Sequence, residues 1–386
     1  MSRTSRTPRV AGLFAGIGGI EVGLKQAGHE TALLCEIDAA AAHVLQARFP
    51  GIPLRDDVRT LGNLPTVDLV AAGFPCTDLS QAGRKIGITG RHSSLVDHVF
   101  RLIDSPNGTP TVLLENVSYM LRLDKGEAMG HLVRRFEELG YAWAYRVVDA
   151  RSFGVPQRRQ RVVMIASRSL DPREVLFADE GNGSGFQDLI GPVDEDCAYG
   201  FYWTEGLRGL GWARNAVPTI KGGSGLGIPS APAVWVPATG EVGTPEIEDG
   251  ERMQGFPADW TLPAIEAGHK PGFRWRMVGN AVCVPMAAWV GRRISEPGTP
   301  VVAFQRMSTG GRWPLAAWGA RGERWSAEAS MQPFDEEPNL LKFLAQPLRP
   351  LSSRAVTGFL SRARSSRLRF SDGFLDALEA HRLRVS

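Results

Sequence analysis

The stretch "RVAGLFAGIGGIEVGLKQAG" (Arg9–Gly28) decides the fold of this chain. An apolar, strand-like run over Arg9–Phe14 leads through a glycine-rich turn into a segment with helical spacing. Glycines there let the backbone approach a ligand closely, and the first N–H groups of the following helix can bind it. Glycines at strand-to-helix turns are also common for structural reasons. The stretch alone therefore predicts a strand–helix unit and leaves its ligand open.

The same alternation continues through the first 168 residues. Further strand-like runs lie at Thr31–Ile37, Val67–Gly73, Thr111–Val117, Tyr141–Ala150 and Arg161–Ser167. Helical spacing is found between them, for example over Gly130–Gly140. Strands that alternate with helices are typical of an α/β fold. We therefore expect a parallel, doubly wound sheet covered on both faces.

After about Ser169 the composition of the sequence changes. Residues 170–275 are rich in Gly, Pro and Trp, with short runs and many turn signals, which predicts a small, irregular, mostly β domain. A helical, apolar pattern returns over Arg274–Ile294. From residue 297 onward the chain is of mixed character. Its last 36 residues carry seven Arg against three acids, and 373–383 has amphipathic helical spacing.

The composition describes a globular protein with weak net charge. Of 386 residues, 43% are hydrophobic and 22% charged, and the net charge is +3. No apolar run is long enough to span a membrane and no secretory signal is found, so we expect a cytoplasmic protein. The four cysteines are Cys35, Cys76, Cys197 and Cys283. None of them forms a C-x-x-C pair or a cluster with the spacing of a zinc site, so we expect neither a disulfide framework nor a structural metal.

An acid follows the second strand at a useful place. Glu36 comes 18 residues after Gly18, where a carboxylate can accept hydrogen bonds from ribose hydroxyls. The third glycine of a dinucleotide fingerprint would fall at Glu21, whose negative charge fits badly beside a pyrophosphate. A cofactor with ribose and adenine but no phosphate fits better, and S-adenosylmethionine is such a molecule.

Other reactive side chains follow further strands. Cys76 stands directly after a proline, Glu115 lies in "ENV", and the arginine-rich "QRRQR" (157–161) leads into the next strand. Ligands of open α/β sheets bind at the carboxyl edge, so these groups can converge there. Taken singly, a lone Cys is more often a buried small hydrophobe, and Glu115 or the arginines could be solvated. Those interpretations leave the shared order unexplained.

This set resembles the DNA cytosine-5 methyltransferase family over about residues 9–168 and 250–294. Eight matching pieces occur in the family's order: "LFAGIGG", "CEID", "RDDV", "GFPC", "LLENV", "FGVPQRRQR", "ERMQGFP" and "MVGNAV". The resemblance implies a Rossmann-like α/β methyltransferase with a doubly wound sheet, S-adenosylmethionine as cofactor and a smaller, mostly β target-recognition domain. We assign 1–169 to catalysis and cofactor binding, 170–273 to target recognition, 274–296 to a helix that returns to the catalytic domain, and 297–386 to an extension of unknown role.

The resemblance also assigns roles to residues. Cys76 is the nucleophile that adds to C6 of cytosine, so that C5 can attack a sulfonium methyl. Glu115, in its protonated form, donates at N3, and Arg161 with Arg159 beside it holds the carbonyl of the base. The implied cofactor contacts are Phe14, Gly16, Gly18, Gly19, Glu36 at the ribose, Asp57 at the adenine amino group, and Asn280. Thr77 stands where the family usually has Gln, and the run before "ERMQGFP" also departs from its pattern.

The same resemblance makes double-stranded DNA the partner. The target base must leave the helix to be reached, and the turn-rich interval must read its neighbours. We expect DNA contacts from Lys221 in that interval, and from a lid loop over Ser80–Ser94, through Ser80, Arg84, Lys85 and Arg91. We expect a monomer that binds no membrane. A cognate restriction endonuclease could be its functional partner without binding to it, or the enzyme could be solitary. The sequence leaves both settings open.

Three other functions share some of these features. A nicotinamide-dependent oxidoreductase explains the glycine loop and Glu36, but not Cys76 with Glu115 and Arg161 at successive strand ends. A DNA-binding protein without turnover is disfavoured by the intact catalytic and cofactor motifs. A tRNA methyltransferase keeps the chemistry. The long, turn-rich interval before "GFP" favours duplex DNA over tRNA.

Overall fold

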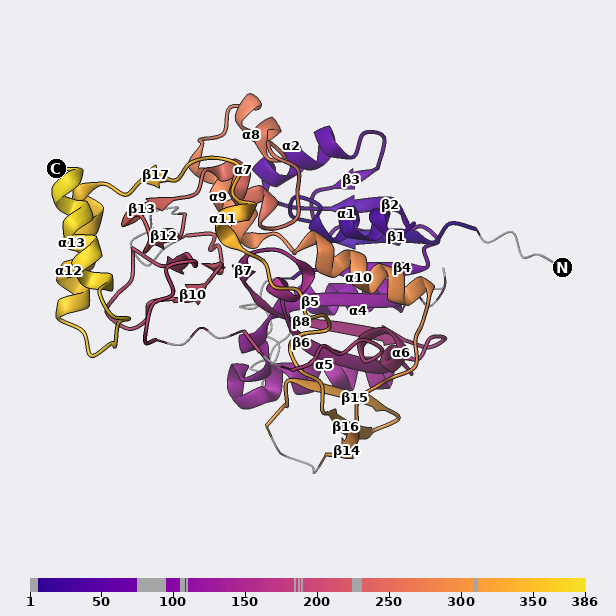
Figure 1. Ribbon diagram of the computed structural model, residues 1–386. Coiled ribbons are helices and arrows are strands. Elements are labelled where there is room, and N and C mark those ends of the chain that lie inside the picture. The colour runs from indigo at the N-terminus through magenta and orange to yellow at the C-terminus, as the bar shows by residue number, and fades with distance from the viewer. Residues whose placement is uncertain are drawn as a thin grey trace, which may run out of the picture. The chain divides into compact units, whose positions relative to one another are not determined.

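The fold is taken from a computed structural model of the 386-residue chain (Figure 1). The structure describes residues 6–74, 95–104, 108, 110–183, 185–186, 188, 190–223, 231–307 and 312–386. The chain divides into two compact units. The first unit comprises 1–149, 160–183 and 282–335, and the second comprises 150–159, 184–281 and 336–386.

One large mixed sheet forms the centre of the first unit. Among the described residues it has ten strands, in the order β14-β16-β15-β6-β8-β5-β4-β1-β2-β3. Their bounds are β1 Arg9–Leu13, β2 Glu30–Cys35, β3 Leu54–Arg55, β4 Leu69–Ala72, β5 Thr111–Val117, β6 Ala142–Asp149, β8 Gln160–Ser167, β14 Phe304–Arg306, β15 Ala316–Ala320 and β16 Glu323–Ala327. Strands β3, β2, β1, β4 and β5 run parallel to one another.

Helices cover both faces of the parallel strands. Helices α4 (Leu95–Ile103) and α5 (Glu127–Glu138) pack with alternate strand residues such as Leu13 and Leu114. Helix α1 (Gly19–Gln26) lies on the other face, where its Glu21 meets Gly12, and α10 (Val284–Ser295) packs on α1. Among the described residues, the remaining helices of this unit are α2 Ala39–Arg48 and α6 Pro172–Leu176, with the 3-10 turns η1 Ser118–Leu121 and η2 Leu123–Gly126.

The expectation of a wholly parallel sheet is wrong for β8. This strand runs antiparallel to both of its neighbours, β5 and β6. Only residues 150–159 connect β6 to β8, and a parallel crossover needs a dozen or more residues. Beyond β6 the sheet continues antiparallel through β15, which pairs Ala317 with Tyr145. A short connection therefore reverses the chain, and the sheet is mixed.

The second unit is built from short strands, as its turn-rich sequence predicts. Its antiparallel sheet consists of β10 Ala213–Arg214, β9 Tyr199–Phe201, β12 Ala233–Val236, β13 Glu241–Thr244 and β17 Arg349–Pro350, in that order. A separate parallel pair joins β7 (Gln157–Arg158) to β11 (Val217–Pro218). The helices are η3 Ala150–Phe153, α7 Ile247–Arg252, α8 Leu262–Glu266, α9 Gly272–Asn280, α11 Leu340–Phe343, α12 Ser353–Arg364 and α13 Phe374–Arg384.

The C-terminal half of the chain divides differently from the sequence-based boundaries. The apolar segment 274–296 forms α9 and α10, which fall in different units because the division lies between Ala281 and Val282. The expected single extension is also divided. Its residues up to Asp335 extend the large sheet of the first unit, and the remainder joins the second unit.

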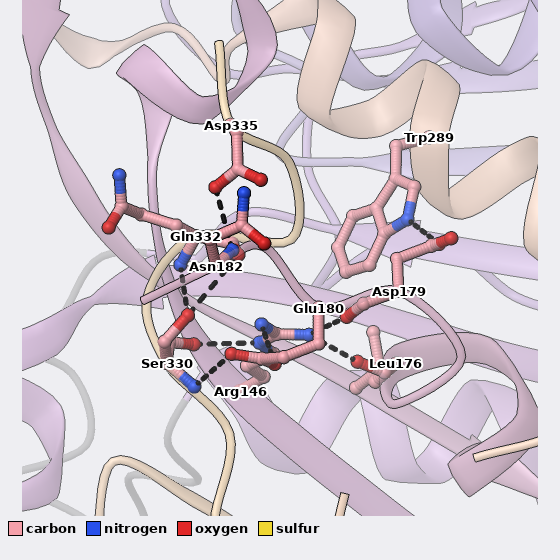
Figure 2. Close-up of polar contacts among 9 residues, drawn as sticks. All are labelled: Arg146, Leu176, Asp179, Glu180, Asn182, Trp289, Ser330, Gln332 and Asp335. Carbon is pink, nitrogen blue, oxygen red and sulfur yellow. Dashed lines mark hydrogen bonds and ion pairs between the residues drawn. The ribbon is translucent and has the colours of Figure 1, made fainter. Parts of the chain in front are cut away.

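A buried arginine ties several segments of the first unit together (Figure 2). Arg146 on β6 is fully buried and forms an ion pair with Glu180 at 2.6 Å. Its guanidinium also donates to the carbonyls of Leu176, Asp179 and Ser330 at 3.1, 2.6 and 2.9 Å. Burial lowers the pKa of Arg146, and the neighbouring Glu180 carboxylate opposes that shift. The sheet thereby anchors the segments that follow α6 and β16.

Within the described ranges, no helix has both the length and the apolar character needed to cross a bilayer.

Candidate active site

One row of paired residues crosses four parallel strands at their carboxyl ends. It consists of Cys35, Leu13, Ala72 and Leu114. Each of these four residues is followed in the chain by one that lies at the same edge of the sheet. These following residues are Glu36, Phe14, Gly73 and Glu115. Because ligands of open α/β sheets bind beyond the carboxyl ends, this edge is the candidate site. The sequence-predicted convergence of the glycine loop with Glu36 and Glu115 is present in the strand register.

The glycine loop is held by Glu36. The carboxylate accepts from the backbone N–H of Gly16 at 2.7 Å and from that of Asp38 at 2.8 Å, one bond at each oxygen. A carboxylate has about four acceptor positions, so capacity for ribose hydroxyls remains. A Cβ at Gly16, whose φ is 55°, would meet nothing within 4 Å, so the loop leaves open space there. These features fit a nucleoside-bearing cofactor.

Close packing fixes the rest of this loop. Gly18 precedes α1 with a φ of 87°, and a Cβ there would fall 2.5 Å from the Phe49 ring. Gly19 begins the helix, and Phe14 has the left-handed φ of 55°. The structure thus brings five predicted cofactor residues together at the ends of β1 and β2, namely Phe14, Gly16, Gly18, Gly19 and Glu36. Burial raises the pKa of Glu36, while hydrogen bonds from Asp38 and Gly16 oppose the shift.

The structure places Asp57 and Asn280 against residues outside the glycine loop. Asp57 follows β3 near the same edge, but both of its oxygens face Arg59, whose hydrogen bond lowers the pKa of Asp57. Asn280 ends α9 in the second unit, where its Oδ1 would lie 2.6 Å from a Cβ on Gly222. Their cofactor contacts stay predictions. Among the described residues, no group of His, Cys, Asp and Glu could hold a metal ion.

Glu115 and Arg161 form a buried pair at this edge. The Arg161 Nε lies 3.0 Å from the Glu115 Oε1, and the two residues are 8% and 7% exposed. The antiparallel direction of β8 brings them together. Its first residues lie beside the last residues of β5, with Arg161 opposite Val117. An acid and a guanidinium so placed can contact the ring nitrogen and carbonyl of one base.

Asn116 is a functional candidate that the sequence reasoning did not single out. Its side chain is buried and donates to the Phe74 carbonyl at 2.9 Å, and its Oδ1 accepts from the N–H of Val117 at 2.9 Å. Phe74 stands two residues before Cys76. Asn116 therefore fixes the point where the chain leaves β4 toward the cysteine. The signal available in the sequence was an amide beside Glu115 at the end of an apolar strand.

The predicted nucleophile lies outside the described residues. So do the predicted DNA contacts Ser80, Arg84, Lys85 and Arg91. The other three cysteines, Cys35, Cys197 and Cys283, are buried. Burial, with the charge of Glu36, raises the pKa of Cys35 to about 11, which makes that thiol a poor nucleophile.

Arg159 and Lys221 are engaged within the second unit. Arg159 is buried and donates to the carbonyls of Gly279 and Ala281 at 3.1 and 2.6 Å. Lys221 pairs with Glu205 and lies 3.7 Å from the centroid of the Tyr202 ring. Arg159 therefore supports the turn after α9. The contacts of these two residues with base and DNA stay predictions.

Glu21 has a structural role that the sequence did not reveal. The side chain is 1% exposed, and a Cβ on Gly12 would fall 2.1 Å from its Oε1, so Gly12 makes the space for the carboxyl. Burial raises the pKa of Glu21 to about 7, and the charge of Glu36 adds to the shift. The glycine loop therefore lies above an acid that burial keeps largely neutral below that pH.

We expect Glu21→Gln to change how stability depends on pH. The folded pKa, about 7, lies above the ordinary value of 4.5, so the stabilising contribution is full at low pH and is lost as pH rises through 7. The variant cannot ionise. Relative to the wild type, it should therefore gain on the order of 3 kcal/mol between about pH 4.5 and 8.

Urea denaturation of both proteins at the two ends of that range measures this difference. Glu30→Gln, an exposed acid at the start of β2, is the matched control for the loss of one carboxylate. Parallel stability curves for wild type and Glu21→Gln would contradict the assignment.

Comparisons with known proteins agree with this geometry. The family model described as C-5 cytosine-specific DNA methylase matches residues 9–181. The chain is 49% identical over 378 residues to the type II methyltransferase M2.BsuMI of Bacillus subtilis, covering 96% of this chain and 97% of that protein. It is 29% identical over 319 residues to the type II methyltransferase M.Bsp6I of Bacillus sp., covering 75% and 97%.

Solved structures share the fold. The methyltransferase EhMeth of Entamoeba histolytica superposes with a TM-score of 0.52 at 13% identity, over 75% of this chain and 99% of that one. DNMT2 of Spodoptera frugiperda gives a TM-score of 0.50 at 14% identity, over 75% and 100%. At these identities the likeness concerns the fold alone. The near full-length relative at 49% identity, with the motifs at one sheet edge, shows that this chain belongs to the C-5 cytosine-specific DNA methylase family.

Proposed function

We propose that this DNA cytosine-5 methyltransferase transfers the methyl group of S-adenosylmethionine to a cytosine within a specific double-stranded DNA sequence. The reaction passes through a covalent adduct of Cys76 with a cytosine extruded from the helix. The observation that carries the proposal is the buried Glu115–Arg161 pair, which lies at the same sheet edge as the loop held by Glu36. That edge combines groups for a base with groups for a nucleoside cofactor.

The chain's own residues would divide the chemistry. The Cys76 thiolate adds to C6, and electron density moves toward N3 and O2, where Glu115 in its protonated form donates and Arg161 holds the carbonyl. S-adenosylmethionine, held by Glu36 and the glycine loop, would supply an electrophilic methyl group for C5. The C5 proton would then pass to water and the N3 proton would return to Glu115, so that the Cys76 thiolate leaves C6. Because Asn116 fixes the Phe74 carbonyl, it would position the segment that carries Cys76.

Recognition is assigned to the second unit by the same proposal. The scaffold groups at the sheet edge can contact only the extruded base, so its stacked neighbours must be read in the groove. From residue 184 to residue 273 the chain belongs to the second unit, and the described residues of this interval form no strand of the large sheet. Relatives named type II methyltransferases favour a restriction–modification setting.

The proposed reaction is tested directly by locating a transferred label. The protein is incubated with S-adenosylmethionine labelled in its methyl group and, separately, with plasmid DNA and with a tRNA pool. We expect the label to appear in the plasmid. Bisulfite sequencing should then place the methyl groups at C5 of cytosines within one short sequence. Label only in tRNA would replace the substrate, and no label in either would overturn the proposal.

Glu36→Ala should weaken the binding of S-adenosylmethionine. A hydrogen bond to a charged group is worth roughly 1.5–3 kcal/mol, so the dissociation constant should rise about ten- to a hundredfold. Calorimetric titration measures it, with Glu30→Ala as the control on the same strand. Because Glu36 also holds Gly16, the melting temperature is recorded alongside. Unchanged affinity would contradict the role, and tight binding of NAD would favour an oxidoreductase.

A further inference from the structure

The last two helices of the chain form an antiparallel hairpin in the second unit. Helix α12 and helix α13 pack together and lie side by side in Figure 1. The hydroxyl of Ser353, at the start of α12, lies 3.2 Å from that of Ser386, just after the end of α13. Residues 365–373 connect the two helices without helix or strand. This hairpin lies beyond the segments whose motifs match the methyltransferase family.

The inner face of the hairpin is anchored in an apolar core. Phe359 and Phe374 contact Phe201 of β9, with ring centroids 5.3 and 5.0 Å apart. Phe374 also contacts Trp212 and Trp235 at 5.1 and 5.4 Å. Arg362 donates from α12 to the carbonyls of Glu205 and Trp203, both at 2.8 Å. The hairpin is therefore a fixed part of the unit that carries the recognition interval.

The first half of the same hairpin is basic in sequence. Residues 354–369 contain five arginines and no acid. Arg362 is used internally, and Arg364 lies 3.3 Å from Glu379. The other three, Arg354, Arg367 and Arg369, are exposed, and no hydrogen bond or ion pair holds them in the described part of the chain. We call residues 354–369 the basic segment.

The spacing of two of these arginines suits a nucleic acid backbone. Over 367–370 exposed and half-buried residues alternate, so Arg367 and Arg369 project to the same side, while Phe370 packs against the core. In extended chain such residues lie roughly 6.6 Å apart. Each DNA strand carries one phosphate per about 3.4 Å of helix axis, so the two guanidiniums can meet nearby phosphates of one strand.

We propose that the basic segment binds the phosphate backbone of the substrate duplex, next to the bases that the second unit reads. The inference rests on the proposed function, because it takes duplex DNA as the substrate. Arg354, Arg367 and Arg369 supply charge and position without reading sequence, as backbone contacts do. The hairpin extends the footprint on DNA beyond the segments that carry the family's motifs.

The test compares DNA binding at several salt concentrations. Fluorescence anisotropy with a labelled duplex of about 30 base pairs gives the dissociation constant between roughly 50 and 300 mM salt. Each lost phosphate contact lowers the slope of log K against log salt by about 0.9. Arg367→Gln/Arg369→Gln should therefore reduce the slope by about 1.8 and weaken binding roughly tenfold or more at about 0.1 M salt.

Two further variants make the outcome decisive. Arg367→Lys/Arg369→Lys keeps both charges and should retain the slope. If the guanidiniums had a purely structural role, the Lys variant would lose affinity as the Gln variant does. Arg306→Gln/Arg321→Gln removes two exposed charges from the β14–β16 region and should leave the slope unchanged. Thermal melts check that each variant is folded.

A Gln variant with the slope of the wild type would overturn the inference, while methylation of plasmid by both proteins would leave the proposed function standing. An equal loss in the Arg306/Arg321 control would also overturn it, because net charge rather than this segment would be responsible. If the wild type bound tRNA and no duplex, the proposed function itself would fail.

Discussion

Replacing Cys76 by serine is expected to abolish methyl transfer while S-adenosylmethionine still binds. Removal of a covalent nucleophile eliminates a step rather than a contact, and in enzymes with covalent intermediates it costs on the order of 10⁴-fold or more in rate. The three other cysteines are buried, and burial raises the pKa of Cys35 and of Cys197. Their thiols are therefore poor candidates for the same step.

Single-turnover transfer of labelled methyl to plasmid DNA measures the loss, and calorimetry measures cofactor binding. Cys197→Ser is the matched control. The Cys197 Sγ donates to Asp194 and accepts from Asn215, both at 3.2 Å, and a hydroxyl can make the same bonds. A duplex containing 5-fluorocytosine should trap the wild type covalently, because the C5 substituent cannot leave as a proton. A Cys76→Ser enzyme with wild-type rate, or an adduct formed by that variant, would contradict the assignment.

Much of the first unit follows from sequence because local pattern and topology agree there. The run Arg9–Gly28 contains an apolar strand, a glycine turn and a helix, and the structure has β1 and α1 in those places. Once the strands are parallel, their carboxyl ends must share one edge. The meeting of Glu36 with the glycine loop, and the position of Glu115, were therefore predictable before any distance was known.

Other features depend on contacts that periodicity cannot show. The reversal at β8 depends on the length of one connection, and it places Arg161 beside Glu115. The burial of Glu21 depends on the missing Cβ of Gly12, a neighbour in space on a different element. The division of residues 297–386 arises because β15 pairs with β6 while β17 pairs with β13. The pairings of β15 and β17 and the contact of Glu21 with Gly12 have no local sequence signal, and the short connection before β8 is visible only as a chain length.

The largest stability effect is expected at Arg146, in the cluster of Figure 2. Arg146→Met would leave the Glu180 carboxylate and the carbonyls of Leu176, Asp179 and Ser330 without their shared donor. Removing one partner of a buried pair costs about 3–5 kcal/mol, and because the Glu180 side chain that remains is 22% exposed, this range is the upper bound here. Whole proteins are stable by only about 5–15 kcal/mol, so a large fall in melting temperature should follow.

A second ion pair of the same sheet provides the comparison. Arg324 on β16 lies 3.1 Å from Glu137, but its side chain is 30% exposed, and pairs in contact with water contribute about 1 kcal/mol or less. Arg324→Met should therefore cost far less than Arg146→Met in urea denaturation. Adding Glu180→Gln to Arg146→Met removes the unpaired charge and should restore part of the loss. Equal costs for the two arginines, or no recovery in the double variant, would show that Arg146 acts through packing of its side chain rather than through its charge.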